Sequence, residues 1–148
     1  MEAFRAHTDE TWGIALGVPS GWNVITNADQ IVLRPADEGP VAGRVTLHPA
    51  DPSLAQGTDG WDEWVKKTKA GFEKSTPGAA TTRRVQAFCS GCPALLTSWS
   101  AGKEAYLVFV VAGPQATYRI QWGAPREDFA AWEPVFEKAS RAFTILRK

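Results

Sequence analysis

Alternating apolar and polar residues predict several short β-strands in the first third of the chain. Ile14, Leu16 and Val18 share one face of an extended segment. A turn at residues 19–21 ends this strand, because proline presets φ and glycine tolerates positive φ. Further strands are predicted at residues 22–25, 30–34 and 44–48. Together the strands indicate an antiparallel meander, preceded by a loose lead-in over residues 1–11.

A helical spacing of apolar residues follows the predicted meander. Trp61, Trp64, Val65 and Phe72 fall on one face of a helix, and Asp59 is suited to cap its N-terminus. Acidic residues lie in the first turn and lysines lie later, which matches the helix dipole. Both tryptophans are therefore predicted to face the core.

The second half of the chain contains four further predicted strands, joined by short turns at residues 89–93, 101–104 and 113–115. The strands are expected at residues 81–88, 94–100, 105–112 and 116–122. In the last of them, apolar Tyr118, Ile120 and Trp122 alternate with polar Arg119 and Gln121, so one face should be buried and the other hydrated. Consecutive strands joined by hairpins favour an antiparallel sheet.

An apolar stripe at spacings of three and four predicts a helix that closes the chain. Pro134 lies inside this pattern, and proline in a helix interior lacks an N–H and clashes with the preceding turn. We therefore expect a short first segment over residues 126–132 and a kink or restart at Pro134. The aromatic residues expected in the core are Tyr118, Trp122, Phe129, Trp132, Phe136 and Phe143.

Length and charge favour one domain, spanning residues 1–148, with no electrostatic attraction to polyanions. The chain has 16 Lys and Arg residues against 16 Asp and Glu residues, and a neutral chain has no charge-driven affinity for nucleic acid or an anionic membrane. The basic pairs at residues 66–67 and 83–84 are short and are interpreted as hydrated surface. Apolar runs fall short of the roughly 20 residues that a membrane span requires.

The first residues have neither the basic segment nor the apolar segment of a secretory signal. The expected location is the cytoplasm if the chain is full length. It is the cell envelope or the extracellular space if the chain is a domain cut from a secreted protein.

Cys89-x-x-Cys92 is the one motif with a recognised chemistry. Two close thiols can form a disulfide or exchange with one, provided that a thiol pKa is lowered, for example by a helix N-terminus. Here the pair lies between two predicted strands, and Pro93 follows the second cysteine. A disulfide across the turn, or two inert thiols, is favoured over a redox enzyme.

Metal and hydrolase chemistry have little support. A zinc site needs four ligands, and His7 and His48 are too far apart in the sequence to complete one with the cysteines. Motifs for a catalytic serine, a zinc protease or a phosphate-binding loop are absent. We therefore expect no catalytic residue, no metal and no cofactor.

Seven tryptophans are many for 148 residues. Trp12 and Trp22 are less readily assigned to the core than the others. They are candidate binding residues that could stack on a ligand at the rim of a groove.

The order of several short motifs resembles the PsbP/DcrB-like fold family. The motifs are Pro19-Ser20-Gly21-Trp22, a middle helix, Gly91-x-Pro93-Ala94, Tyr118-Arg119-Ile120 and Ser140-x-x-Phe143. The resemblance covers residues 14–146 and implies an α+β fold, in which an antiparallel sheet of about six or seven strands is sandwiched by helices.

Proteins with similar folds serve as extrinsic subunits of photosystem II, as envelope lipoproteins, as secretion-effector chaperones and as a Ran-binding import factor. The family has no shared catalytic residues to carry over. The resemblance therefore implies a non-enzymatic accessory domain that holds a partner protein on a sheet face or in a groove. The alternatives are a small-ligand or carbohydrate-binding module that uses Trp12 and Trp22, and a thiol-redox protein that uses Cys89 and Cys92.

Overall fold

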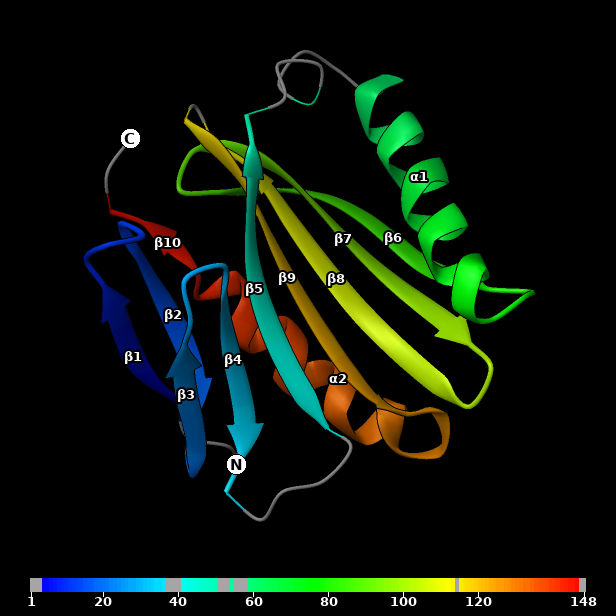
Figure 1. Ribbon diagram of the computed structural model, residues 1–148, viewed down its shortest axis with the longest axis horizontal. Helices are drawn as coiled ribbons and strands as arrows, with labels where there is room; N and C mark the ends of the chain where they lie inside the picture. Colours follow the sequence, from blue (N-terminus) through cyan, green and yellow to red (C-terminus); the bar gives the residue numbers. More distant parts are fainter. Residues whose placement is uncertain (1–3, 37–40, 51–53, 55–58, 114, 147–148) are drawn as a thin grey trace.

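The computed structural model describes residues 4–36, 41–50, 54, 59–113 and 115–146. In these ranges the chain forms strands and two helices (Figure 1). The strands are β1 (Phe4–Asp9), β2 (Ile14–Pro19), β3 (Trp22–Thr26), β4 (Gln30–Pro35), β5 (Ala42–Pro49), β6 (Ala80–Cys89), β7 (Cys92–Ala101), β8 (Glu104–Ala112), β9 (Ala116–Pro125) and β10 (Thr144–Ile145). The helices are α1 (Asp59–Ser75) and α2 (Arg126–Arg141).

The central element is a seven-stranded antiparallel sheet with the order β3-β4-β5-β9-β8-β7-β6. A smaller sheet has the order β1-β2-β10. Figure 1 shows α1 in front of the large sheet and α2 behind it. The predicted α+β fold, with an antiparallel sheet between helices, is confirmed.

Tight turns set the register of the large sheet. At the β6–β7 hairpin, Ser90 and Gly91 have φ values of 53° and 76°. Two positive φ values in a two-residue loop are typical of a type I′ turn, whose twist matches that of the strands. The turn places Cys89 directly opposite Cys92.

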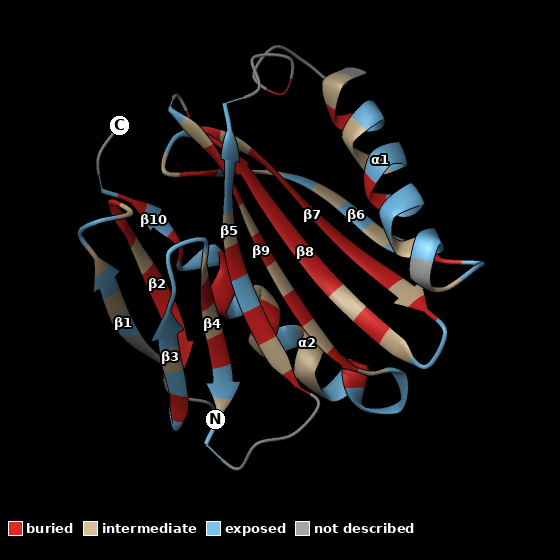
Figure 2. Ribbon diagram, viewed as in Figure 1, coloured by how far each residue is buried: buried red, intermediate tan, exposed pale blue. Residues whose placement is uncertain are grey.

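Two separate apolar cores lie on the two faces of the large sheet. The larger core fills the space between this sheet, α2 and β2, and the smaller core lies beneath α1. Figure 2 shows that buried residues dominate β7 and β8, which are covered on both faces. Continuous apolar runs in these strands follow from that burial, since neither face contacts water.

Aromatic rings dominate the larger core. The ring of Trp122 stacks on Phe136 with centroids 5.2 Å apart, and Trp22 meets the Trp122 ring edge-on at 5.8 Å. The indole N–H of Trp122 donates a hydrogen bond of 2.8 Å to the Ser140 hydroxyl. The predicted core aromatics are buried, with the exception of half-buried Trp132.

The N-terminal region differs from the sequence-based expectation. Residues 4–9 form β1 instead of a loose lead-in, and they pair with β2. The meander comprises β3, β4 and β5, whereas β2 belongs to the small sheet with β1 and β10. Only two residues of β10 pair with β2, so this contact leaves almost no periodic signal in the sequence.

The closing helix shows no restart, which was one of the two outcomes expected, because α2 continues through Pro134. Pro134 cannot donate the hydrogen bond that Ala130 would accept four residues earlier. Both residues are exposed, so water can satisfy this carbonyl. Phe129 and Phe136, on the opposite side of the helix, remain buried on either side of the proline. Neither helix in the described ranges has an apolar stretch long enough to cross a membrane.

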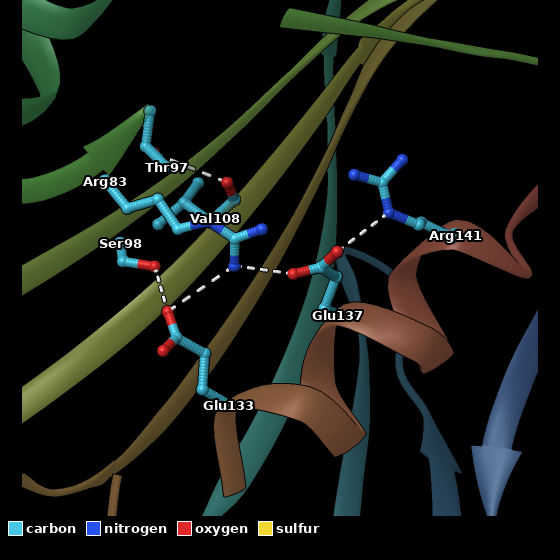
Figure 3. A network of polar contacts seen from close by, with 7 residues as sticks. All are labelled: Arg83, Thr97, Ser98, Val108, Glu133, Glu137 and Arg141. Atoms are coloured by element: carbon cyan, nitrogen blue, oxygen red, sulfur yellow. Dashed lines mark hydrogen bonds and ion pairs between the residues drawn. The ribbon is translucent and has the colours of Figure 1, made fainter. Parts of the chain in front are cut away.

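A polar network links α2 to β6 and β7 (Figure 3). Arg83 on β6 pairs with Glu137 on α2 at 2.5 Å, and Glu137 also accepts a hydrogen bond of 3.1 Å from Arg141. One turn earlier, the Glu133 carboxylate accepts a hydrogen bond of 2.5 Å from the buried Ser98 hydroxyl. These contacts fix the helix over the sheet on the side away from α1.

We expect Glu137→Gln to weaken the acid sensitivity of folding. Hydrogen bonding to Arg83 holds the pKa of Glu137 below its usual 4.5. A lowered folded-state pKa stabilises the fold above pH 4.5, and this contribution is lost as the pH falls through the folded-state value. The variant should therefore be less stable than the parent at pH 7 and approach it in stability near pH 3. The difference should be about 1 kcal/mol or less, since both side chains are partly exposed.

Urea unfolding at a series of pH values measures this effect. The matched control is Glu10→Gln, an exposed glutamate in the β1–β2 turn. A constant stability difference between Glu137→Gln and the parent from pH 7 to pH 3 would contradict the prediction.

Candidate functional site

Helix α1 covers only part of its face of the large sheet. The smaller core under α1 draws on β7 and β8, and Figure 1 shows no helix in front of β4 and β5. The strand register places nine side chains of β4, β5 and β9 on this side of the sheet, which we call the open face; three of them, His48, Thr117 and Arg119, lie at its border with α1. The nine are Gln30, Val32, Arg34, Arg44, Thr46, His48, Thr117, Arg119 and Gln121.

Positive charge gathers on the open face although the whole chain is neutral. Arg34, Arg44 and Arg119 come from three strands, and the register places Arg44 opposite Gln121 and Thr46 opposite Arg119. Burial lowers the pKa of Arg119, and the nearby charge of Arg44 lowers it further. Two guanidinium groups that repel each other in this way create a local preference for an anion.

A shallow depression of about 450 Å³ crosses β4, β5, β9 and β8 at one end of the open face. Arg34, Arg44 and Gln121 line it together with Tyr106 and Glu104. Glu104 is the one carboxylate among its described lining residues. The depression exists partly because the β9 residue here is Gly123, and an added Cβ would lie 3.0 Å from the Tyr106 ring.

Tyr106 forms the wall of this depression towards α1. Its ring stacks on Phe72 with centroids 4.9 Å apart. Burial raises the pKa of Tyr106, with a smaller increase from Glu104. Its hydroxyl therefore stays protonated at neutral pH and can donate a hydrogen bond to an anion.

A second cavity of about 250 Å³ lies between α1 and the other end of the open face, and we call it the α1 pocket. Its polar lining includes His48, Lys67, Thr117 and Arg119. Thr117 Oγ1 and Arg119 Nε are buried and have no hydrogen-bond partner within the described part of the chain. Arg119 uses another nitrogen, Nη2, to donate a hydrogen bond of 2.7 Å to Gln121.

His48 lies at the border between the α1 pocket and the open face. Its Nε2 atom lies 3.0 Å from the Thr46 hydroxyl. Burial lowers the pKa of His48, and the Arg119 charge lowers it further. The imidazole is therefore neutral at pH 7 and contributes hydrogen bonding rather than charge.

The two tryptophans predicted as binding residues lie away from the open face. Trp22 is 5% exposed, and its ring packs among Trp122, Trp132 and Phe136. A ring this deeply buried presents almost no surface to a ligand. Trp12 is half-buried beside the larger core, and its backbone N–H donates a hydrogen bond of 2.9 Å to Asp9. The structure brings neither ring to a described cavity.

The structure buries both Cys89 and Cys92. The Cys89 thiol donates a hydrogen bond of 3.0 Å to the carbonyl of Phe143, and Cys92 lies 3.8 Å from the carbonyl of Ser90. Both face the larger core, where a protein substrate has little access. Their oxidation state remains a prediction.

The histidines occupy separate sheets, since His7 belongs to β1 and His48 to β5. No cluster of three or more His, Cys, Asp or Glu side chains suited to a metal occurs within the described ranges. The arrangement that the structure offers is a surface rich in hydrogen-bond donors, with two depressions.

Sequence patterns gave no direct signal for the open face. Its three arginines are separated by ten and by seventy-five positions in the sequence, so they form no basic run. The available signal was the alternation in β9, where Arg119 occupies the polar face. That alternation could not show that β5, seventy residues earlier, would be its neighbour.

Comparisons with known proteins show the fold. Neither a family model nor a curated protein matches the sequence. Among solved structures, cyanobacterial PsbP (CyanoP) from Synechocystis sp. PCC 6803 matches with a TM-score of 0.75 at 12% identity, covering 98% of this chain and 94% of that chain.

Two further structures match along nearly their whole length. PA94 of Pseudomonas aeruginosa, a protein of unknown function, gives a TM-score of 0.60 at 14% identity, with 94% of each chain covered. LpqN of Mycobacterium tuberculosis, which is involved in cell envelope biogenesis, gives 0.57 at 17% identity, covering 97% of this chain and 90% of that chain. The fold of this chain is therefore that of the PsbP/DcrB-like proteins.

Proposed function

We propose that this protein is a non-enzymatic binding domain that holds an acidic segment of a partner protein on its open face. The observation that carries the proposal is the gathering of Arg34 and Arg44 at a depression that α1 leaves uncovered, with Arg119 beside them at the edge of α1. Similar folds occur in CyanoP and in the envelope-biogenesis protein LpqN. The fold alone therefore leaves the partner open, and the side chains of this chain must identify its chemistry.

Charge complementarity selects an acidic partner. Guanidinium groups bind carboxylates through paired hydrogen bonds and are more weakly hydrated than lysine ammonium groups. Gln30, Gln121 and the Tyr106 hydroxyl add polar groups around the same depression. An extended peptide with carboxylates on one side would meet donors along β4, β5 and β9.

A protein partner is favoured over single-stranded nucleic acid. Binding of single strands usually relies on exposed aromatic rings on which the bases stack. The aromatic ring at the described depression is Tyr106, and its face already stacks on Phe72. Few aromatic faces thus remain for bases, whereas the arginines remain able to bind carboxylates.

The test measures binding of a fluorescein-labelled peptide of alternating Glu and Ser residues by anisotropy. We expect the double variant Arg34→Glu/Arg44→Glu to weaken binding by at least about tenfold, which corresponds to about 1.4 kcal/mol. Charge reversal replaces attraction by repulsion at two neighbouring positions. Binding to the parent protein should also weaken as salt is raised, since exposed charges are screened.

The matched control is Arg126→Glu/Lys69→Glu, which changes the net charge equally at exposed positions outside the open face. Unchanged peptide affinity in Arg34→Glu/Arg44→Glu, or an equal loss in the control, would contradict the proposal. A single-stranded oligonucleotide of the same charge serves as a competitor. If it binds more tightly than the peptide, the partner class is wrong.

A further inference from the structure

The α1 pocket contains two buried polar groups that the described protein leaves unsatisfied. Thr117 is 5% exposed, and its hydroxyl has no hydrogen-bond partner among the described residues. The Nε atom of Arg119 is also buried and also lacks a partner there. The two residues are two positions apart on β9, so their side chains point to the same face of the sheet. Two donors therefore converge on one side of the pocket.

Unsatisfied buried donors cost stability, because each has lost its hydrogen bonds to water. Valine has nearly the shape of threonine and would remove this cost at position 117. A costly arrangement of this kind is typical of a functional site, in which a ligand supplies the missing acceptor. The two donors therefore call for an acceptor that fits between them.

Lys67 and Arg119 give the pocket a positive character. Lys67 reaches the pocket from α1, and the neutral His48 lies directly opposite Thr117 in the β5–β9 register. No carboxylate occurs among the described residues that line the pocket. The expected acceptor is therefore an anion.

The other wall of the α1 pocket is apolar. Leu54 is 2% exposed, Val110 lies directly opposite Arg119 in the β8–β9 register, and Trp64 projects from α1. A volume of about 250 Å³ is slightly below the range of typical drug-sized sites, which begins at about 300 Å³. A ligand of this size must be small and must combine an anionic end with an apolar portion.

We propose that the α1 pocket binds a small monocarboxylate with a short aliphatic chain. The carboxylate accepts hydrogen bonds from Arg119 Nε and the Thr117 hydroxyl, and Lys67 adds charge. The chain packs against Leu54, Trp64 and Val110. This inference goes beyond the proposed binding of an acidic protein segment and can be tested independently of it.

Hexanoate is the probe, and binding is measured by NMR on the isotope-labelled full chain. We expect the side-chain Nε–H signal of Arg119 to shift, because it gains a charged acceptor. Acetate lacks the chain and 1-hexanol lacks the charge, so each should bind at least about tenfold more weakly than hexanoate. Equal binding of acetate would overturn the apolar part of the proposal, and equal binding of hexanol would overturn the anionic part.

Titration of His48 gives a second readout. The described groups that face it are Thr46 and Arg44 from its own strand, Arg119 from β9 and Lys67 from α1. A bound carboxylate offsets the positive charges of Arg119 and Lys67, so hexanoate should raise the pKa of His48. An unchanged pKa at saturating hexanoate would place the ligand elsewhere.

Thr117→Val separates a binding role from a structural one. The variant should weaken hexanoate binding by about tenfold, since a hydrogen bond to a charged acceptor is lost. Its Tm should stay the same or rise, because an unsatisfied buried hydroxyl disappears. Unchanged affinity would contradict the proposal, and so would weaker affinity accompanied by a lower Tm, which would indicate a structural role. The control is Thr97→Val, at a buried threonine whose hydroxyl donates to the Val108 carbonyl at 3.4 Å and accepts a hydrogen bond of 2.8 Å from the Trp99 indole. This variant should lower the Tm and leave hexanoate affinity unchanged.

Failure of this proposal can be distinguished from failure of the proposed function. Arg34 belongs to the open face and lies outside the α1 pocket. Arg34→Glu should therefore weaken binding of the acidic peptide and leave hexanoate affinity unchanged. Thr117→Val should have the opposite pattern. If either variant loses binding of both the acidic peptide and hexanoate, the two sites are one.

Discussion

Replacing Trp122 with alanine is expected to lower the free energy of unfolding by about 3–5 kcal/mol. The indole is 1% exposed and lies at the centre of the larger core. Its removal deletes the stack on Phe136 and the edge contact with Trp22. It also leaves the buried Ser140 hydroxyl without the 2.8 Å hydrogen bond that it accepts from the indole.

Chemical denaturation with guanidinium chloride measures this loss, and Trp12→Ala is the matched control. Trp12 is half-buried at the edge of the same core, and its hydrogen bond to Asp9 involves the backbone N–H rather than the ring. It should therefore cost well under half as much as Trp122→Ala. Equal losses in the two variants would mean that the stacked cluster adds nothing beyond the burial of a large ring.

The strands of the large sheet could be predicted because each has an alternating or continuous apolar pattern. Tyr118, Ile120 and Trp122 are buried as predicted, and α2 covers them. By contrast, β1 reads Phe-Arg-Ala-His-Thr-Asp and has too few apolar residues for a periodic signal. It forms because β2 presents an unpaired edge with which its backbone groups can bond.

The strand order could not be predicted from local patterns. Hairpins join β6 to β7, β7 to β8 and β8 to β9, and these three pairings were expected. The pairing of β5 with β9 joins segments about seventy residues apart, and no feature of either segment specifies the other. This pairing also creates the open face, because it places Arg44 and Arg119 on neighbouring strands.

The candidate site was missed for the same reason. Isolated arginines on polar strand faces are ordinary in sequence, and only the folded sheet shows that they are neighbours. Trp22 shows the reverse case. The sequence left it as a candidate for a ring at the rim of a groove, but in the folded protein the ring is buried among other aromatics.

Both sheet faces use a glycine beside an aromatic ring. Gly123 lies under the Tyr106 ring on the α1 side, and Gly43 lies under the Trp122 ring on the α2 side. The two glycines lie on neighbouring strands, in adjacent pairs of the β5–β9 register. The ring of Tyr106 thereby borders the depression of the open face, while the ring of Trp122 closes the core behind it.

Gly43→Ala should therefore lower the free energy of unfolding by about 1–3 kcal/mol. An added Cβ would lie 2.5 Å from Cε3 of Trp122. This ring cannot move freely, because it stacks on Phe136 and its indole N–H donates a hydrogen bond to Ser140. The control is Gly71→Ala, at an exposed position in α1 where an added Cβ meets no atom within 4 Å. That variant should gain stability, since alanine favours a helix more than glycine does.

A double-mutant cycle tests whether the ring of Trp122 is the cause. Trp122→Leu removes the indole atoms nearest Gly43, so Gly43→Ala should cost less in that background than in the parent. We expect a coupling energy of about 0.5–3 kcal/mol, which is typical of residues in contact. Additive losses would show that the cost arises in the β5 backbone instead, and the close approach of glycine to the indole would then have no role in stability.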